Sequence, residues 1–226
     1  MITLHHLEYS QSFRILWLLE ELGCEYELKT YERDKSTHLA PPDYKALSPL
    51  GTAPVITDGQ VALAESSAIT DYILDQIPDQ NLRPAADSPD RARYLFWFHA
   101  AQGSMMPLML MEAVFNILIT RVPFWMRPFV SSALNQASAR MILPRMNKIL
   151  EVAEKDLSEK PWFGGDSLSA ADIVLSYPME SALERNFITD QHSQCLDWLE
   201  RVKELPSYKS ARIKDGKESV VLKVGS

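Results

Sequence analysis

The stretch ITLHHLEYSQSFRILWLLEELGCEYELKTY, residues 2–31, decides the fold of the first part of the chain. It opens with a short apolar run at residues 2–7, which predicts a strand. It closes with apolar and polar residues alternating over 26–30, the period of a second strand. Between them, residues 10–22 carry apolar side chains on nearly every face, and Gly23 follows where helices commonly end. The stretch therefore predicts a β-α-β unit with a largely buried helix.

The next segment predicts a short helix, a hairpin and a longer helix. A helical piece is expected near 43–47. Residues 55–57 and 61–63 flank Asp58-Gly59, a dipeptide typical of tight hairpin turns. Ser66 is placed to cap a helix that Pro78 ends. The expected order of the first part is thus βαβ, then α, then ββα.

The remainder of the chain is expected to be helical. Residues 78–89 contain three prolines and few apolar residues, which is typical of a linker. The predicted helices then cover 90–118, 124–157 with a kink or break at Pro144, 170–184 and 194–203, and a tail strand is expected at 220–224. The sequence predicts an α/β domain at 1–78, a linker at 79–89 and an all-helical domain at 90–226.

Composition and charge support two domains of an ordinary globular protein. The chain has 226 residues, a net charge of −7 and 46% hydrophobic residues. Residues 1–86 carry a net charge of −7, residues 87–150 carry +4, and residues 151–226 carry −4. The break near residue 87 indicates a domain boundary. Bulk charge of this sign argues against nucleic-acid binding.

The compartment signals favour the cytoplasm. The N-terminus MITLHHLEYS lacks the basic leader and apolar core of a signal peptide. Cys24 and Cys195 are too few for a disulfide framework and lack metal-ligand spacing. Residues 94–111 carry no formal charge but include several polar side chains. They predict a buried helix pair, not a stable membrane span.

Four motifs in this order resemble the cytosolic glutathione transferases of the serine type, as in bacteria and fungi. They are SQSFRILWLLEELG at 10–23, SPLGTAPVITDG at 48–59, LAESSAITDYI at 63–73 and SLSAADI at 167–173. The resemblance covers nearly the whole chain. It implies a thioredoxin-like first domain, a helical second domain, a homodimer and a transferase that uses glutathione as co-substrate, without a metal, in detoxification.

The resemblance makes Ser10 the residue that activates the glutathione thiol. Ser10 lies between the first strand and the first helix, where its hydroxyl would donate to the sulfur. Its position alone favours an ordinary helix cap, and the other motifs in register favour the activating role. Tyr9 is the alternative activator, because tyrosine-type relatives use a hydroxyl in this loop. Ser12 is a third hydroxyl, expected either to bind glutathione or to cap the helix.

The remaining glutathione contacts follow from two later motifs. Ala53 precedes Pro54, and a cis bond there would present the Ala53 backbone to the tripeptide. Glu65 and Ser66 would hold the γ-glutamyl end, with the carboxylate on the ammonium and the serine and helix N-terminus on the α-carboxylate. Thr52 stands where many relatives have lysine, which weakens the expected grip on the glycyl carboxylate.

The second substrate is expected to be a small apolar electrophile or a peroxide. Its pocket would be lined by adaptable side chains from the first helices of the second domain: Met105, Met106, Met109 and Phe115. Ser169 and Asp172 are assigned to a capping box, which serves folding.

Two other functions fit the same residues. A glutathione-dependent peroxidase or disulfide reductase would use the same scaffold, although serine replaces the cysteine that covalent relatives carry at the helix start. A non-catalytic binding or interaction protein is the alternative from another class.

Overall fold

The computed structural model describes residues 1–77 and 80–219, and its first part is built on a four-stranded sheet. The strands are β1 (Ile2–Leu7), β2 (Tyr26–Tyr31), β3 (Val55–Asp58) and β4 (Val61–Ala64), in the order β2-β1-β3-β4. β1 and β2 run parallel, and β3 is antiparallel to both β1 and β4. The predicted β-α-β unit and hairpin are confirmed.

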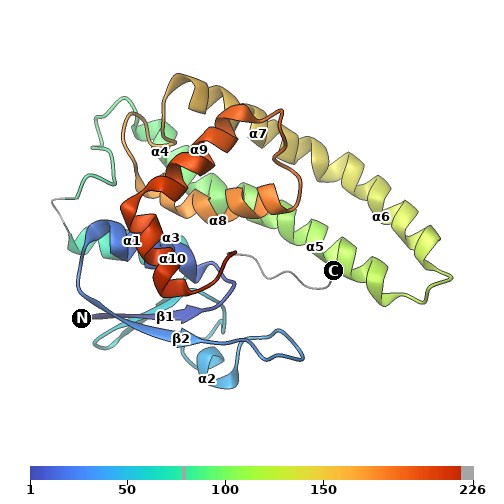
Figure 1. Ribbon diagram of the computed structural model, residues 1–226, viewed down its shortest axis with the longest axis horizontal. Coiled ribbons are helices and arrows are strands. Elements are labelled where there is room, and N and C mark those ends of the chain that lie inside the picture. The colour runs from blue at the N-terminus through green and yellow to red at the C-terminus, as the bar shows by residue number, and fades with distance from the viewer. Residues whose placement is uncertain (78–79, 220–226) are drawn as a thin grey trace.

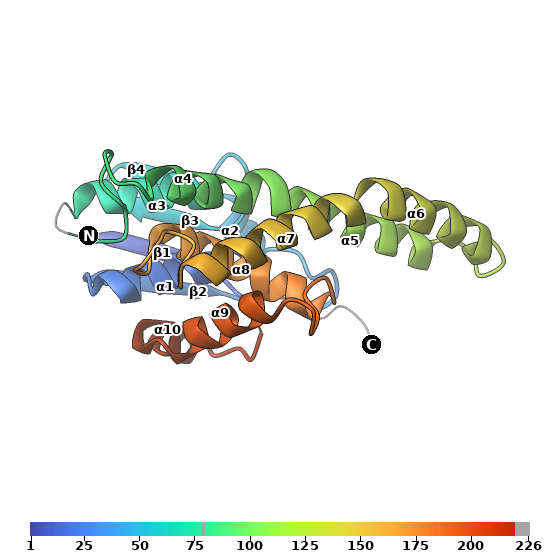
Figure 2. The ribbon, with the colours of Figure 1, turned by 90° about the horizontal axis from the view of Figure 1, so that it is seen from above.

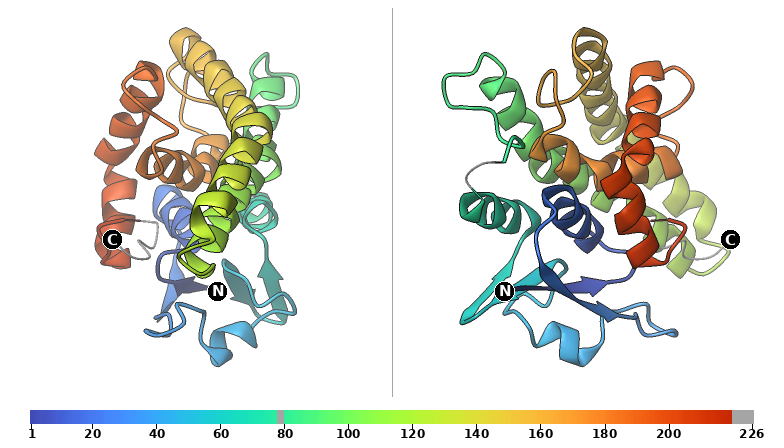
Figure 3. Two further views of the ribbon diagram at one scale, coloured as in Figure 1. Left: turned by 90° about the vertical axis from the view of Figure 1, so that its right-hand side faces the viewer. Right: turned by 60° about the vertical axis from the view of Figure 1, so that its left-hand side comes forward.

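Helices cover both faces of this sheet. α1 (Ser12–Leu22) and α3 (Ser66–Gln76) lie on one face, and the short α2 (Pro42–Lys45) lies on the other (Figures 1 and 3). α1 ends at Gly23, whose φ of 61° is the left-handed conformation that favours glycine. Its side chains from Ser12 to Leu19 are all buried, as the apolar residues on nearly every face predicted.

The strand register brings three loops to one edge of the sheet. Val55, the first residue of β3, pairs with His5 on β1 and with Ala64, the last residue of β4. The loop after β1, the loop before β3 and the loop after β4 therefore meet at that edge. These are the segments that contain Ser10, Ala53 and Glu65.

The second part of the chain is helical throughout the described residues (Figures 1 and 2). Its elements are α4 (Arg91–Ala100), the π-helical turn η1 (Ala101–Met105), α5 (Met106–Arg121), α6 (Arg127–Met141), α7 (Leu143–Glu159), α8 (Ala170–Glu184), α9 (Ser193–Glu204) and α10 (Pro206–Asp215). The expected break near Pro144 falls at Ile142. The strand expected at 220–224 lies outside the described residues.

The last helix, α10, was not predicted. Its sequence has many charged residues, and it contains no local signal that identifies the element on which the helix packs. In the structure it packs back onto α1 of the first part, where the Tyr208 ring meets the edge of Trp17 and the Trp17 Nε1–H donates to Ser207 Oγ at 3.0 Å. The chain therefore closes on its own N-terminal domain.

α5 and α6 form a hairpin that extends beyond the rest of the molecule (Figure 2). Its tip exposes Phe124, Trp125 and Phe129. Together, residues 91–121 form one continuous helical rod, long and apolar enough to cross a membrane by length and composition alone. The body of the protein buries Tyr94 and Trp97, but only 17% of the most apolar 18-residue window of the rod is buried. The buried helix pair expected at 94–111 is therefore wrong, because these residues belong to one continuous rod whose apolar part is mostly exposed.

The predicted serine caps are wrong in detail. α1 begins at Ser12 itself, and its N-cap residue is Gln11, which makes no side-chain capping bond. α3 begins at Ser66, and its N-cap residue is Glu65, again without a capping bond. Ser12 and Ser66 are thus the first helical residues rather than caps, and Ser10 lies one residue before the cap position of α1.

The capping box of α8 is confirmed and does more than cap a helix. Ser169 and Asp172 exchange the expected bonds. The fully buried Asp172 carboxylate also accepts the Phe163 N–H at 2.8 Å and the Trp198 Nε1–H at 2.9 Å. One side chain therefore joins α8 to α9 and to the preceding loop.

We expect Asp172→Ala to lower the free energy of unfolding by about 3 kcal/mol, well above the roughly 1 kcal/mol of a simple cap, because several buried donors lose their acceptor. Urea denaturation measures the change. Asp166→Ala, at an exposed ion pair with Lys160, is the matched control and should change little. Equal losses in the two variants would contradict this role of Asp172.

Candidate functional site

Ser10 lies at the meeting of the three loops, and its hydroxyl is turned into the protein. Only 5% of the residue is exposed. Its Oγ donates to the Leu7 carbonyl at 2.7 Å, lies 2.8 Å from Ser12 Oγ and accepts the Ser12 N–H at 3.2 Å. The predicted thiol activator is therefore held within a hydrogen-bonded cluster.

Ser12 is the centre of that cluster and is completely buried. Its Oγ accepts the Leu7 N–H at 3.1 Å and lies 2.9 Å from His6 Nδ1. A side chain in this position is a support for the loop and for Ser10. Its oxygen is committed to partners inside the protein, and direct binding of glutathione by Ser12 stays a prediction.

Tyr9 is held by its backbone in an unusual conformation. Its φ is 49°, which a bulky residue rarely adopts. Arg33 secures the loop, since its Nη2 donates to the Tyr9 carbonyl at 3.2 Å and its Nε to the Glu8 carbonyl at 3.1 Å. The Lys217 ammonium lies 5.3 Å from the centre of the Tyr9 ring. Arg33 and Lys217 are site-shaping residues that sequence reasoning missed.

The loop before β3 has the expected backbone. The Ala53-Pro54 bond is cis. Pro54 is buried, Ala53 is half-buried and Thr52 is exposed beside them. A peptide backbone laid along this edge could pair with the Ala53 N–H and C=O.

The start of α3 carries two polar groups without a partner. The Oγ atoms of Ser66 and Ser67 are buried and make no hydrogen bond within the described residues. Glu65 precedes them with an exposed side chain and a φ of 76°, a strained conformation that costs on the order of 1 kcal/mol. Unpaired hydroxyls beside the free N–H groups of a helix N-terminus suit a carboxylate.

A buried arginine joins the loop cluster to the helical domain. Arg14 is fully buried, and its Nη1 donates to the Val174 carbonyl of α8 at 2.6 Å. Its Nη2 donates to Gln11 and, at 3.2 Å, to Gln102 of η1. Burial lowers the pKa of Arg14 to about 9, against the opposing effect of Tyr177 and Glu65. Arg14 is therefore a structural cation that joins α1 to α8 and η1.

The four residues predicted to line the electrophile pocket differ in exposure, and their role stays a prediction. Met105 and Met109 are 0% and 3% exposed and belong to the hydrophobic core. Met106 and Phe115 are half-buried against that core. A groove of about 400 Å³ lies between α7 and the adjoining segments η1 and α5, and it is lined by Gly103, Ser104, Pro107, Leu108, Met111, Arg145, Lys148 and Ile149.

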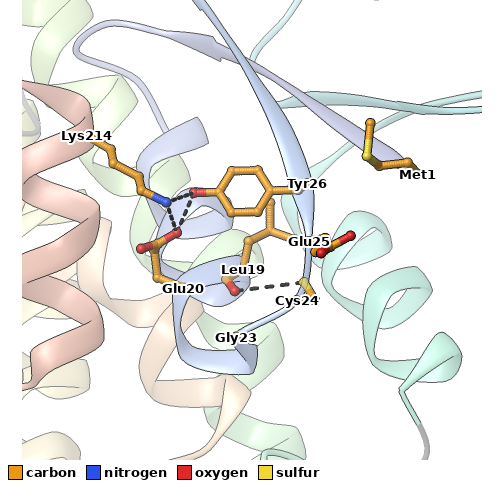
Figure 4. A pocket seen from close by; sticks show the side chains of 8 residues that line it. All are labelled: Met1, Leu19, Glu20, Gly23, Cys24, Glu25, Tyr26 and Lys214. Atoms are coloured by element: carbon orange, nitrogen blue, oxygen red, sulfur yellow. Dashed lines mark hydrogen bonds and ion pairs between the residues drawn. The ribbon is translucent and has the colours of Figure 1, made fainter.

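A larger hollow lies at the far end of α1 from Ser10. Its volume is about 510 Å³, and Glu20, Cys24, Tyr26 and Lys214 lie in its wall (Figure 4). Lys214 Nζ pairs with Glu20 at 2.6 Å, so the charges there already satisfy each other. Burial raises the pKa of the Cys24 thiol, which disfavours a reactive thiolate.

Among residues 1–77 and 80–219, no three His, Cys, Asp or Glu side chains are grouped to hold a metal ion.

Comparison with known proteins agrees with this arrangement. The family model of the glutathione S-transferase N-terminal domain matches residues 1–75, and that of the C-terminal domain matches 108–206. Glutathione S-transferase 3 of Schizosaccharomyces pombe is 29% identical, over 93% of this chain and 86% of its own length. A probable glutathione S-transferase of Oryza sativa, GSTF2, is 30% identical over 71% and 70%.

Among solved structures, a glutathione S-transferase from Actinobacillus pleuropneumoniae is 32% identical, with a TM-score of 0.75 over 96% of this chain and 93% of that one. Both domains, their order and their fold are shared. The chain is therefore a member of the cytosolic glutathione transferase family and a glutathione transferase enzyme.

Proposed function

We propose that this enzyme holds glutathione at the edge formed by the Ser10, Ala53 and Ser66 loops and presents its thiolate to a small apolar electrophile or a peroxide. The unpartnered Ser66 and Ser67 hydroxyls carry the proposal. Buried hydroxyls normally have hydrogen-bond partners, so these two favour a ligand that supplies acceptors. The α-carboxylate of the γ-glutamyl group does so.

The rest of the tripeptide is assigned by chemistry. Glu65, exposed beside Ser66, takes the ammonium group. The Ala53 backbone pairs with the cysteinyl backbone, which brings the sulfur toward the Ser10 loop. Because residues 1–86 carry a net charge of −7, the general field repels an anionic ligand. Binding must therefore rest on these local groups.

Catalysis would come from stabilising the thiolate. A free thiol has a pKa of about 8.5, and lowering it by about two units needs roughly 2.7 kcal/mol of preferential thiolate stabilisation. A hydroxyl donor together with the N-terminal end of α1 supplies energy of that order. The bound thiolate then attacks a carbon atom or a peroxide oxygen held beside it. Removal of such electrophiles would be a detoxifying role in a reducing cytoplasm.

Binding is tested on immobilised glutathione. The wild-type chain should be retained and eluted by free glutathione. Ser66→Ala should weaken binding roughly tenfold or more, since a hydrogen bond to a charged group contributes about 1.5–3 kcal/mol. Its stability should be nearly unchanged, because Ser66 Oγ has no partner to lose. Ser158→Ala, at an exposed position of α7, is the control. A wild-type chain that flows through would refute the proposal.

The activating hydroxyl is tested by mutation. We expect Ser10→Ala to raise the thiol pKa of bound glutathione, measured by ultraviolet thiolate absorbance, and to cut turnover at least tenfold. Tyr9→Phe should leave both quantities unchanged. The reverse pattern would transfer the role to Tyr9. Comparing an aryl halide with an organic peroxide as second substrate separates the transferase from the peroxidase reaction.

We also propose that the enzyme is a homodimer. Leu110, Val114 and Ile117 form an exposed apolar stripe along α5, with the spacing of one helix face. Such a stripe supports burial against a second copy.

Sedimentation velocity should show a dimer, and Ile117→Asp should shift it to monomer. Asn116→Asp, one residue away and also exposed, should not. A wild-type monomer at micromolar concentration would contradict the proposal.

A further inference from the structure

Ser10 stands at one end of a chain of buried hydrogen bonds that begins in the last helix. Asp215 Oδ1, at the end of α10, lies 2.7 Å from His6 Nε2. His6 Nδ1 lies 2.9 Å from Ser12 Oγ, which lies 2.8 Å from Ser10 Oγ. The residues His6, Ser10 and Ser12 are at most 5% exposed, and the Asp215 side chain is 3% exposed.

We infer that Asp215 and His6 are positioning residues, which act through Ser12 to decide whether the Ser10 hydroxyl donates its proton inward or toward the ligand. The inference rests on the proposed function of Ser10. None of the four residues needs to move, because only the directions of the hydrogen bonds change.

The argument starts from the number of protons available. A serine hydroxyl has one proton to donate and two lone pairs that accept. Ser12 Oγ accepts the Leu7 N–H, which uses one lone pair. Its single proton can go to His6 Nδ1, to the Leu7 carbonyl at 3.1 Å or to Ser10 Oγ. The state of His6 selects among them.

With a neutral His6, the hydrogen-bond chain directs the Ser10 proton inward, away from the ligand. The Asp215 carboxylate only accepts, so the imidazole proton sits on Nε2 and Nδ1 becomes an acceptor. Ser12 then donates to His6 Nδ1. The Leu7 carbonyl must take its hydroxyl donor from Ser10, at 2.7 Å. No proton of Ser10 remains for a thiolate.

With a protonated His6, the directions of the hydrogen bonds between His6, Ser12 and Ser10 reverse. Nδ1–H now donates to Ser12 Oγ, which fills the second lone pair of that oxygen. The Ser12 proton turns to the Leu7 carbonyl. Ser10 is relieved of that bond and can donate outward, while its oxygen still accepts the Ser12 N–H. The imidazolium charge itself, two hydroxyls away, also favours an anion at the site.

Other charged and titratable groups lie near His6 and Asp215 on the neighbouring elements. On α10, Arg212 Nη1 lies 3.6 Å from Asp215 Oδ2, and Arg212 Nη2 pairs with Glu180 of α8 at 2.5 Å. Glu8, the residue directly after β1, pairs with Lys217 at 2.6 Å. His5, the neighbour of His6, points to the other face of the sheet, toward Tyr31 and Thr57.

The first test is a double-mutant cycle. Asp215→Asn keeps the shape but removes the charge that pairs with imidazolium, so Ser10 should stay inward. We expect the thiol pKa of bound glutathione to rise by about one unit. This corresponds to about tenfold less thiolate at a pH below that pKa. In a Ser12→Ala background, which breaks the chain, Asp215→Asn should have no further effect. Asp197→Asn, exposed on α9, is the control.

A purely structural role for Asp215 predicts another pattern. Asp215→Asn would then lower the melting temperature and change the thiol pKa equally in both backgrounds, and that result would overturn the inference. In the wild type, the pH profile of kcat/KM should show a step, and this step should vanish in Ser12→Ala. A step that persists in Ser12→Ala would also overturn it.

A measurement without glutathione separates the inference from the proposed function. In the free protein at high pH, ¹⁵N NMR should find the His6 proton on Nε2 and none on Nδ1. A proton on Nδ1 would overturn the inference even if the enzyme binds glutathione. The expected tautomer together with failure to bind glutathione would instead refute the proposed function.

Discussion

The burial of α1 is the constraint on which the rest of the structure depends. Its side chains are apolar on nearly every face, so no single neighbour can remove them from water. The sheet covers one side of α1, α3 and α8 cover others, and α10 returns from the end of the chain to cover what remains. Two parts of the chain that could each form a domain are thereby joined around one helix.

The same burial places unusual polar groups near the active site. A helix clamped on all sides needs internal partners for the polar side chains on its first turn. Arg14 finds them in the Val174 carbonyl and in Gln11 and Gln102. Ser12 finds them in Leu7 and His6. The interactions that fasten α1 in place therefore also set the geometry of the Ser10 loop.

Local periodicity and turn chemistry predicted much of the fold. The alternation at 26–30, the Asp58-Gly59 turn and the Ser169-Asp172 box each depend on residues close together in sequence, and each is present. The resemblance of motifs added the cis bond at Pro54. Contacts between distant segments leave no such local signal. The sequence did not predict α10, and it placed Met105 and Met109 in a pocket, because burial depends on what packs over a residue.

For the site, the sequence by itself determined which chemical groups stand at the ends of β1 and β4 and before β3. Their meeting follows from the strand register, which the alternating pattern of the strands already constrains. Only the tertiary structure decided which of these groups are free. It committed the Ser10 hydroxyl to Leu7 and Ser12 and brought Asp215 against His6. It left the Ser66 and Ser67 hydroxyls without a hydrogen-bond partner among the residues that the structure describes. A hydroxyl's availability depends on every acceptor within about 3 Å, and here those acceptors come from the whole length of the chain.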